Sequence, residues 1–80
     1  MPQSDREKQF RLNDRVLVSV AGGWKQPSFG LICSGPESVE TLQGRDFFYW
    51  VRFDEPQEDV NGPDKYRQAQ ILSRYLEHAI

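Results

Sequence analysis

The stretch YWVRFDEP, residues 49–56, decides the fold, because aromatic and β-branched residues alternate in it with a period of two. Such side chains suit the pleated, half-buried surface of a β-strand. The alternation places Val51 and Phe53 on one face and Trp50 and Arg52 on the other. Because an unpaired arginine is costly to bury, we expect Val51 and Phe53 to point into the core and Trp50 to lie on the outer face.

This central strand is expected to begin at Asp46 and to end before Pro56, whose nitrogen cannot donate a ladder hydrogen bond. The same period adds Phe47 to the inner face and Phe48 to the outer face. The segment that follows, residues 54–64, is rich in carboxylates and turn-forming residues. We expect it to form an exposed acidic loop.

A first strand is expected at Arg15–Val20, directly after the turn-forming pair Asn13-Asp14. Its valines, at positions 16, 18 and 20, share one face, which we expect to point inward. Phe10 and Leu12 continue this period on the valine side. They are expected to cap one end of the core.

The next strand is expected at Phe29–Ser34, where Gly30 allows another backbone to approach closely. Turn-forming residues at 35–38 then predict a turn, which is followed by a short third strand at residues 39–42. Gly44 is expected to support the hairpin that leads into the central strand.

The C-terminal segment, residues 66–80, fits two patterns. Apolar residues alternate with glutamines at Arg67–Ile71, which favours a strand there. A single 3₁₀ turn at Leu72–Tyr75 and a short closing strand at Leu76–Ile80 would follow. The apolar spacing also fits an amphipathic helix over the whole segment, and this alternative stays open.

Four segments in this order resemble small SH3-like barrels. Residues 13–18, NDRVLV, resemble their opening G-D-x-V-x-V strand, and residues 29–32, FGLI, resemble their second strand. Residues 49–54, YWVRFD, resemble their Y-x-V-x-F strand, and residues 69–77, AQILSRYLE, resemble their ending. KOW, Tudor-like and PsaE-like domains share this layout. The resemblance implies a mainly β fold, an SH3-like small barrel of about five strands with a 3₁₀ turn before the last strand. Because this fold hosts many unrelated functions, the resemblance implies no particular activity.

The chain of 80 residues carries ten basic residues, twelve acidic residues and a formal net charge of −2. Its length fits one domain, and we expect a flexible tail at residues 1–9 and the barrel at residues 10–80. The charge balance lacks the basic excess of duplex nucleic-acid binders. A single cysteine excludes an internal disulfide, and no apolar run reaches the length of a membrane span. We therefore expect a cytoplasmic protein with no membrane partner.

No constellation of residues predicts a reaction. The single cysteine, Cys33, and the single histidine, His78, lie on separate predicted strands, which disfavours a nucleophilic pair. One residue of each type also excludes the usual zinc sites. The acidic segment at residues 54–64 offers oxygen ligands, but its spacing does not match a calcium-binding EF-hand loop. We expect a protein that is not an enzyme and has no catalytic residue, metal or cofactor.

The aromatic residues exceed what a small barrel must bury, which favours a surface for a protein partner. Trp24 lies in a loop after two glycines, where it either covers the core or contacts a ligand. Carboxylates near such a surface would tune its charge. The residues that we expect to bind the partner are Trp24, Phe48, Trp50, Arg52, Asp54 and Glu55.

Other interpretations stay open. In one, the rings only close the core; in another, a dimer buries Trp50 across an open sheet edge. In a third, the chain is a small accessory subunit of a larger enzyme. In a fourth, it is a KOW-like domain associated with nucleic acid, in which case the contacting residues are Arg11, Arg15, Arg45 and Arg52.

Overall fold

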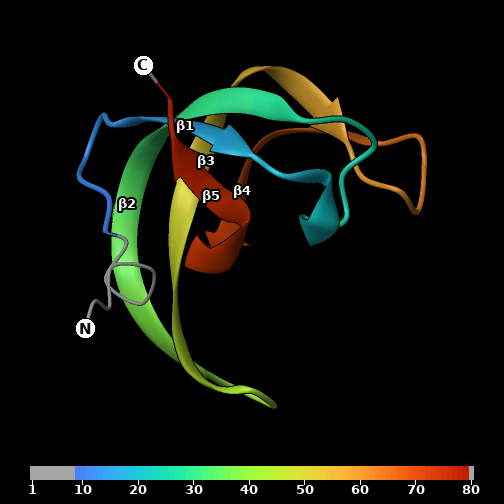
Figure 1. Cartoon of the computed structure of the whole chain (residues 1–80). Helices are drawn as coiled ribbons and strands as arrows, with labels where there is room; N and C mark the ends of the chain where they lie inside the picture. The colour runs from blue at the N-terminus through green and yellow to red at the C-terminus, as the bar shows by residue number, and fades with distance from the viewer. Residues whose placement is uncertain (1–8, 80) are drawn as a thin grey trace.

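The computed structural model describes residues 9–79, which form five antiparallel strands in one sheet (Figure 1). The strands are β1 (Arg15–Val18), β2 (Ser28–Thr41), β3 (Gly44–Glu58), β4 (Lys65–Leu72) and β5 (Leu76–His78). Two 3₁₀ turns, η1 (Val20–Gly22) and η2 (Ser73–Tyr75), follow β1 and β4. The predicted mainly β fold is confirmed. The predicted tail at residues 1–9 falls, except for its last residue, outside the described part of the chain.

The sheet has the strand order β4-β3-β2-β1-β5, so β4 and β5 lie at its two edges. The long strands β2 and β3 curve strongly and carry the sheet around the core (Figure 1). Within residues 9–79, no strand pairing joins β4 to β5. The strands and the final 3₁₀ turn therefore match the predicted layout, but the sheet does not close into a barrel.

The inner face of the sheet holds the hydrophobic core. On β3, Tyr49, Val51 and Phe53 have only 1%, 0% and 5% of their surface exposed. The predicted inner face of the central strand is therefore confirmed for Val51 and Phe53. The other buried hydrophobic residues are Phe10, Val16, Val18, Trp24, Ile32, Ile71 and Leu76.

Gly30 lies opposite Phe53 in the β2–β3 ladder. A Cβ atom at this position would lie 2.5 Å from the backbone oxygen of Arg52 and 2.8 Å from a methyl carbon of Val51. Real Cβ atoms do not make contacts this short, so only glycine fits without a shift of the backbone. The close backbone approach predicted for this residue is confirmed.

The second and third predicted strands are one continuous strand, β2. The turn predicted at residues 35–38 is wrong, because the chain keeps its pairing with β3 through two register shifts. These shifts fall between Ile32 and Ser34 and between Ser34 and Glu37. Gly35 has a φ of 114° and lies against β3, where a Cβ atom would be 3.0 Å from backbone atoms. Bulges thus absorb the turn-forming residues without ending the strand.

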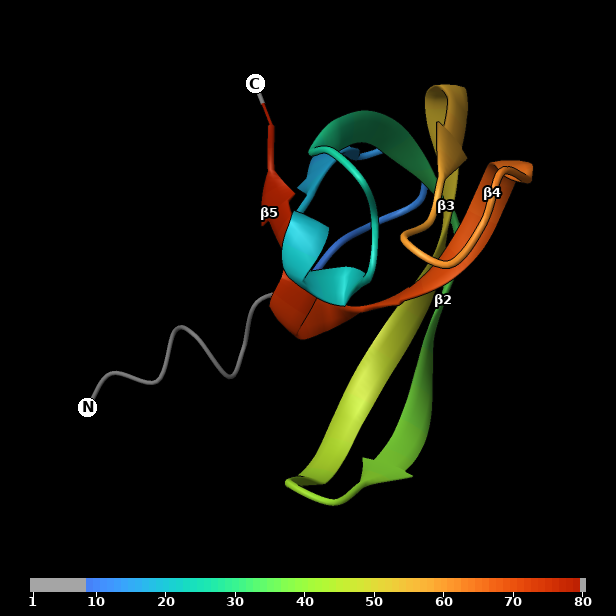
Figure 2. The same cartoon turned by 90° about the vertical axis from the view of Figure 1, so that its right-hand side faces the viewer.

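Beyond the body of the sheet, β2 and β3 continue as a two-stranded arm, which we define as residues 38–47 (Figure 2). The arm ends in a hairpin where Thr41 pairs with Gly44, as predicted for this glycine. Leu42 at the tip is fully exposed. Phe47 was expected on the inner face but is 43% exposed, because it lies in the arm and not above the core.

Two further details of the N-terminal half differ from the prediction. β1 ends early, because the Ser19 side chain accepts a hydrogen bond from the backbone N–H of Ala21 and begins η1. Val20 therefore leaves the inward face and is 45% exposed. Phe10 is buried as predicted, but Leu12 is 64% exposed.

The end of β3 also differs, because the strand continues through Pro56 to Glu58. The register of β3 against β4 shifts between Arg52 and Gln57. Pro56 lies inside this irregular segment, where the two strands have no matched residues and a missing N–H breaks no ladder bond. The acidic segment is thus strand up to Glu58 and irregular chain only at residues 59–64.

At the C-terminus, β4, η2 and β5 follow one another with bounds close to those predicted. The alternative of an amphipathic helix over residues 66–80 is not formed in the part that the structure describes. No helix in residues 9–79 has both the length and the apolar character needed to cross a membrane.

Candidate functional site

The outer face of the sheet carries large apolar side chains on three neighbouring strands. Leu17 of β1 lies opposite Phe29 of β2, and Leu31 is two residues further along β2. Trp50 of β3 lies opposite Ser34 and alternates with the buried residues of its strand. Opposed residues in antiparallel strands point to the same face. We call Leu17, Phe29, Leu31 and Trp50 the outer patch.

The outer patch keeps a large contact with solvent. Phe29 is 46% exposed and Leu31 is 38% exposed, whereas Leu17 and Trp50 are half-buried. Single exposed apolar residues are ordinary on protein surfaces, but several of them on one face of three neighbouring strands are typical of interaction surfaces.

An ion pair spans the outer patch. The guanidinium carbon of Arg15 lies 5.4 Å from the centre of the Phe29 ring. The Nη2 atom of Arg15 is 2.5 Å from Oδ2 of Asp54, so the pair links β1 to β3 across β2. Both side chains are nearly half exposed, so the pair contributes little to stability. Its effect is to hold a cation over an exposed aromatic ring.

Four of the predicted site residues share the outer side of β3: Phe48, Trp50, Arg52 and Asp54. Arg52 lies opposite Leu31, which places its charge beside the outer patch. Phe48 is half-buried at the start of the arm. The period-two pattern thus brings these side chains together, while their role in binding stays a prediction.

Trp24 lies away from the outer patch, inside the core. Its ring centre is 5.0 Å from that of Phe53 and 5.9 Å from that of Tyr66, and only 8% of the residue is exposed. A β-bridge between Trp24 and Asp59 ties the loop after η1 to the end of β3. Of the two interpretations of this residue, the position fits the one in which it covers the core. The structure does not bring Trp24 and Trp50 together.

Sequence reasoning missed three members of the outer patch, Leu17, Phe29 and Leu31. The signal was present, because Phe29 and Leu31 alternate with Gly30 and Ile32 and so share the opposite face. What could not be read from the sequence is that this face of β2 lies beside the outer face of β3.

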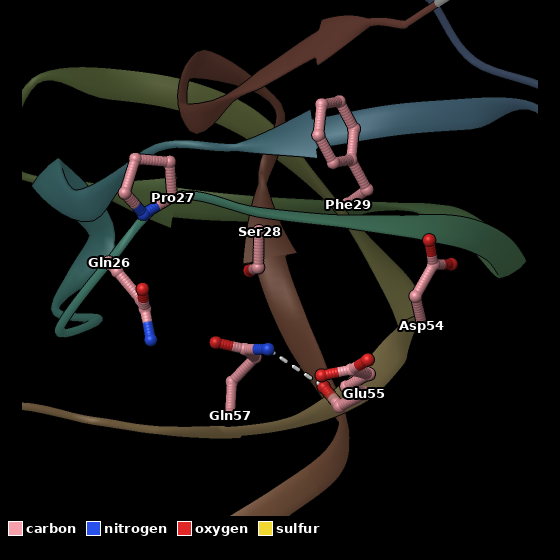
Figure 3. A pocket seen from close by; sticks show the side chains of 7 residues that line it. All are labelled: Gln26, Pro27, Ser28, Phe29, Asp54, Glu55 and Gln57. Carbon is pink, nitrogen blue, oxygen red and sulfur yellow. Dashed lines mark hydrogen bonds between the residues drawn. The ribbon is translucent and has the colours of Figure 1, made fainter.

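A polar pocket of about 290 Å³ opens beside the outer patch, between the start of β2 and the irregular segment of β3 (Figure 3). Its lining residues are Gln26, Pro27, Ser28, Phe29, Asp54, Glu55 and Gln57. The Gln57 amide nitrogen donates a hydrogen bond of 2.9 Å to the backbone oxygen of Glu55. Glu55, which was predicted for the binding surface, therefore lies in the wall of this pocket.

Next to the pocket, Lys25 fastens the loop before β2 to the end of β3. Its Nζ atom is 2.8 Å from Oε1 of Glu58, and its backbone N–H donates to the Glu58 backbone oxygen at 3.1 Å. The hydrogen bond and positive charge of Lys25 hold the pKa of Glu58 below its usual value. Both residues adjoin the pocket in sequence, because Lys25 precedes Gln26 and Glu58 follows Gln57 of the lining.

Asp46 anchors the arm to η2. Its Oδ2 atom accepts a hydrogen bond of 2.8 Å from Nε of Arg74, and its Oδ1 atom accepts bonds from Oγ of Ser73 at 3.0 Å and from the Phe47 N–H at 2.7 Å. Partial burial would raise the pKa of Asp46, but these hydrogen bonds outweigh it and hold the pKa below its ordinary value of 3.8. The carboxylate is therefore charged at neutral pH.

The residues considered for catalysis lie apart. Cys33 is exposed on β2, whereas His78 belongs to β5, on the far side of β1. The His78 ring is 4.4 Å from that of Phe10, and its Nε2 atom is 3.4 Å from Asp14. Across residues 9–79, no three His, Cys, Asp or Glu side chains are grouped so as to hold a metal ion. The expectations about catalysis, metals and cofactors stay predictions.

Comparison with known proteins identifies no relative: no protein-family model, no curated protein and no solved structure matches the chain. The function is therefore argued from the surface itself.

Proposed function

We propose that the protein is a non-enzymatic protein-interaction module that binds a protein partner through the outer face of its sheet. The observation that carries the proposal is the outer patch, in which Phe29 and Leu31 are 46% and 38% exposed at the middle of the sheet. Hydrogen-bonded strands on both sides fix the backbone of this surface, so little of it needs to be ordered on binding.

The composition of the surface fits a protein partner. Aromatic rings and arginines are the usual anchors of protein interfaces, and the outer face presents Phe29 and Trp50 beside Arg15 and Arg52. Asp54 gives the same face a negative charge. A partner with an apolar centre and charges of both signs at its rim would complement this arrangement.

The KOW-like alternative is less well supported, because two of its arginines are already paired. Arg15 binds Asp54, and Arg45 lies 3.1 Å from Glu40 in the arm. A phosphate would have to compete with these carboxylates. An accessory subunit of an enzyme would use the same outer face and is one form of the proposed function.

The test compares two phenylalanines of similar exposure. Phe29→Ala removes the centre of the outer patch, whereas Phe47→Ala removes a ring that is 43% exposed but lies in the arm. Immobilised parent and variants are used to capture partners from native lysate. We expect Phe29→Ala to lose partners that the parent and Phe47→Ala retain, while both variants keep a cooperative thermal transition.

Equal capture by Phe29→Ala and the parent would contradict the proposal. Capture that falls by about 10³-fold or more between 50 and 200 mM salt would instead indicate phosphate contacts. Light scattering of the purified protein tests self-association, and a dimer disrupted by Phe29→Ala would identify the partner as a second copy of the chain.

A further inference from the structure

The pocket beside the outer patch exists because β3 leaves β2 early. The last matched pair of the two strands is Gly30 with Phe53. Residues 54–56 then run without matched partners until Gln57 pairs with Tyr66 of β4. The start of β2 and this segment of β3 diverge, and the space between them is the pocket in Figure 3.

The floor of the pocket holds a buried hydroxyl without a partner. Ser28 is only 6% exposed, and its Oγ atom makes no hydrogen bond within residues 9–79. A buried hydroxyl without a partner destabilises the folded state. Figure 3 shows this hydroxyl directed toward the space between the side chains of Gln26 and Gln57.

Two further acceptors line the pocket. The Gln57 amide nitrogen is held by the Glu55 backbone oxygen at 2.9 Å, which leaves its Oε1 atom on the side of Ser28 and Gln26 (Figure 3). The Glu55 carboxylate forms no ion pair in the described part of the chain, whereas Asp54 is neutralised by Arg15. The lining of the pocket therefore carries an excess negative charge and three oxygen acceptors, the Ser28 Oγ, the Gln57 Oε1 and the Glu55 carboxylate.

We propose that this pocket binds a primary ammonium group, such as that of a lysine side chain or a small alkylamine. An ammonium has three donors and no acceptor, which matches the Ser28 Oγ, the Gln57 Oε1 and the Glu55 carboxylate. Pro27 and Phe29 are the apolar residues of the pocket lining.

The same observations argue against other ligand classes. A divalent cation needs several oxygen ligands, and within residues 9–79 no group of three acidic, histidine or cysteine side chains is present to provide them. An anion would be repelled by Glu55.

The test uses n-butylammonium chloride as the probe and the ¹⁵N-labelled full chain. Ionic strength is kept constant with sodium chloride, and 1-butanol serves as the uncharged control. We expect saturable shifts of the amides of Ser28, Phe29, Glu55 and Gln57, with a Kd on the order of millimolar for so small a ligand. Shifts that do not saturate, or that 1-butanol reproduces, would overturn the proposal.

Two variants with matched controls locate the contacts. Glu55→Gln should weaken butylammonium binding by about tenfold, whereas Glu37→Gln, an exposed glutamate at the start of the arm, should not change it. Ser28→Ala should also weaken binding, yet raise the melting temperature by about 4 °C because an unpaired buried hydroxyl is removed. Ser38→Ala, exposed on the same strand, should do neither. Unchanged affinity in Glu55→Gln would refute the assignment.

A comparison of two peptides distinguishes a protein partner from a small amine as the source of the ammonium. A blocked alanine peptide with one central lysine is compared with the same peptide carrying norleucine. Tighter binding of the lysine peptide than of butylammonium assigns a protein partner, and equal binding assigns a small amine; both support an ammonium site. The proposal does not depend on the outer patch, because Leu31→Ala, which changes the outer patch but not the pocket lining, can abolish partner capture while the Glu55 contact persists.

Discussion

The two faces of β3 are built from similar residues and have different environments. Tyr49, Val51 and Phe53 are nearly without solvent contact, whereas Trp50 is half-buried and Arg52 is exposed on the same strand. The inner residues face β1, β5 and the Trp24 loop, which together complete the core. Aromatic content alone therefore does not tell which residues stabilise the fold, and four substitutions measure the difference between the faces.

The largest effect is expected for Phe53→Ala on the inner face. The Phe53 ring packs 5.0 Å from Trp24, and its removal should leave a cavity that lowers the free energy of unfolding by about 3–5 kcal/mol. Chemical denaturation measures this loss. Phe47→Ala, the exposed counterpart in the arm, should lose far less. If both variants lost a similar free energy of unfolding, Phe53 would contribute no more to stability than the exposed Phe47, which would contradict the assignment of Phe53 to the core.

Gly30→Ala adds an atom to the inner side and should be the second most harmful change. The new methyl would lie 2.5 Å from a backbone oxygen of β3, which cannot move without disturbing the ladder. We expect a loss of about 3 kcal/mol, at the upper end for overpacking. Gly62→Ala, where nothing lies within 4 Å, is the control. If Gly30→Ala lost less stability than Gly62→Ala, β2 and β3 would be able to move apart at this point without cost.

Trp50→Ala tests the outer face, where the expected loss is smaller. Because Trp50 is half-buried, we expect the free energy of unfolding to fall by about 1–2 kcal/mol, less than for a core aromatic ring. The thermal transition should stay cooperative. Collapse of the fold in this variant would show that the outer ring is structural, and would favour the interpretation in which the rings only close the fold.

The smallest effect concerns the base of the arm. Asp46→Asn removes the charge that binds Arg74 and should cost about 1 kcal/mol at neutral pH. Because the pKa of Asp46 is lower in the folded protein than in the unfolded chain, its contribution is complete above pH 3.8 and is lost as the pH falls through the folded pKa.

Melting temperatures measured from pH 7 to pH 2 check this dependence. The parent should lose more stability than Asp46→Asn as the pH falls below 3.8. Asp64→Asn, in the exposed loop after β3, should follow the parent curve. Parallel curves for the parent and Asp46→Asn would show that the carboxylate makes no net contribution.

Alternation correctly predicted that Val16, Val18, Val51 and Phe53 are inner residues, and it predicted the order of the C-terminal elements, but it also wrongly placed Val20 and Phe47 on the inner face. Alternation did not predict where a strand ends or bulges when a single residue controls the local backbone geometry. Ser19 ends β1 through a side-chain hydrogen bond, and Gly35 sits in a bulge that a local pattern cannot distinguish from a turn. Trp24 packs on Phe53 and Tyr66 and forms a bridge with the distant residue Asp59, and local sequence does not reveal these long-range contacts. The pocket depends on where β3 separates from β2, which is set by the pairing of both strands with the rest of the sheet.

The arm has a consequence for the motions of the molecule. Within residues 9–79 its strands pair only with each other, so every second amide there points away from the partner strand, and few buried side chains cover the arm. The bonds of Asp46 to η2 hold its base, while the tip at Leu42 has no cover from the described residues. We therefore expect hydrogen exchange in the arm to proceed by local opening, well before global unfolding releases the amides of Val16 and Val51. The hairpin would then fray from its tip while the body that carries the outer patch stays intact.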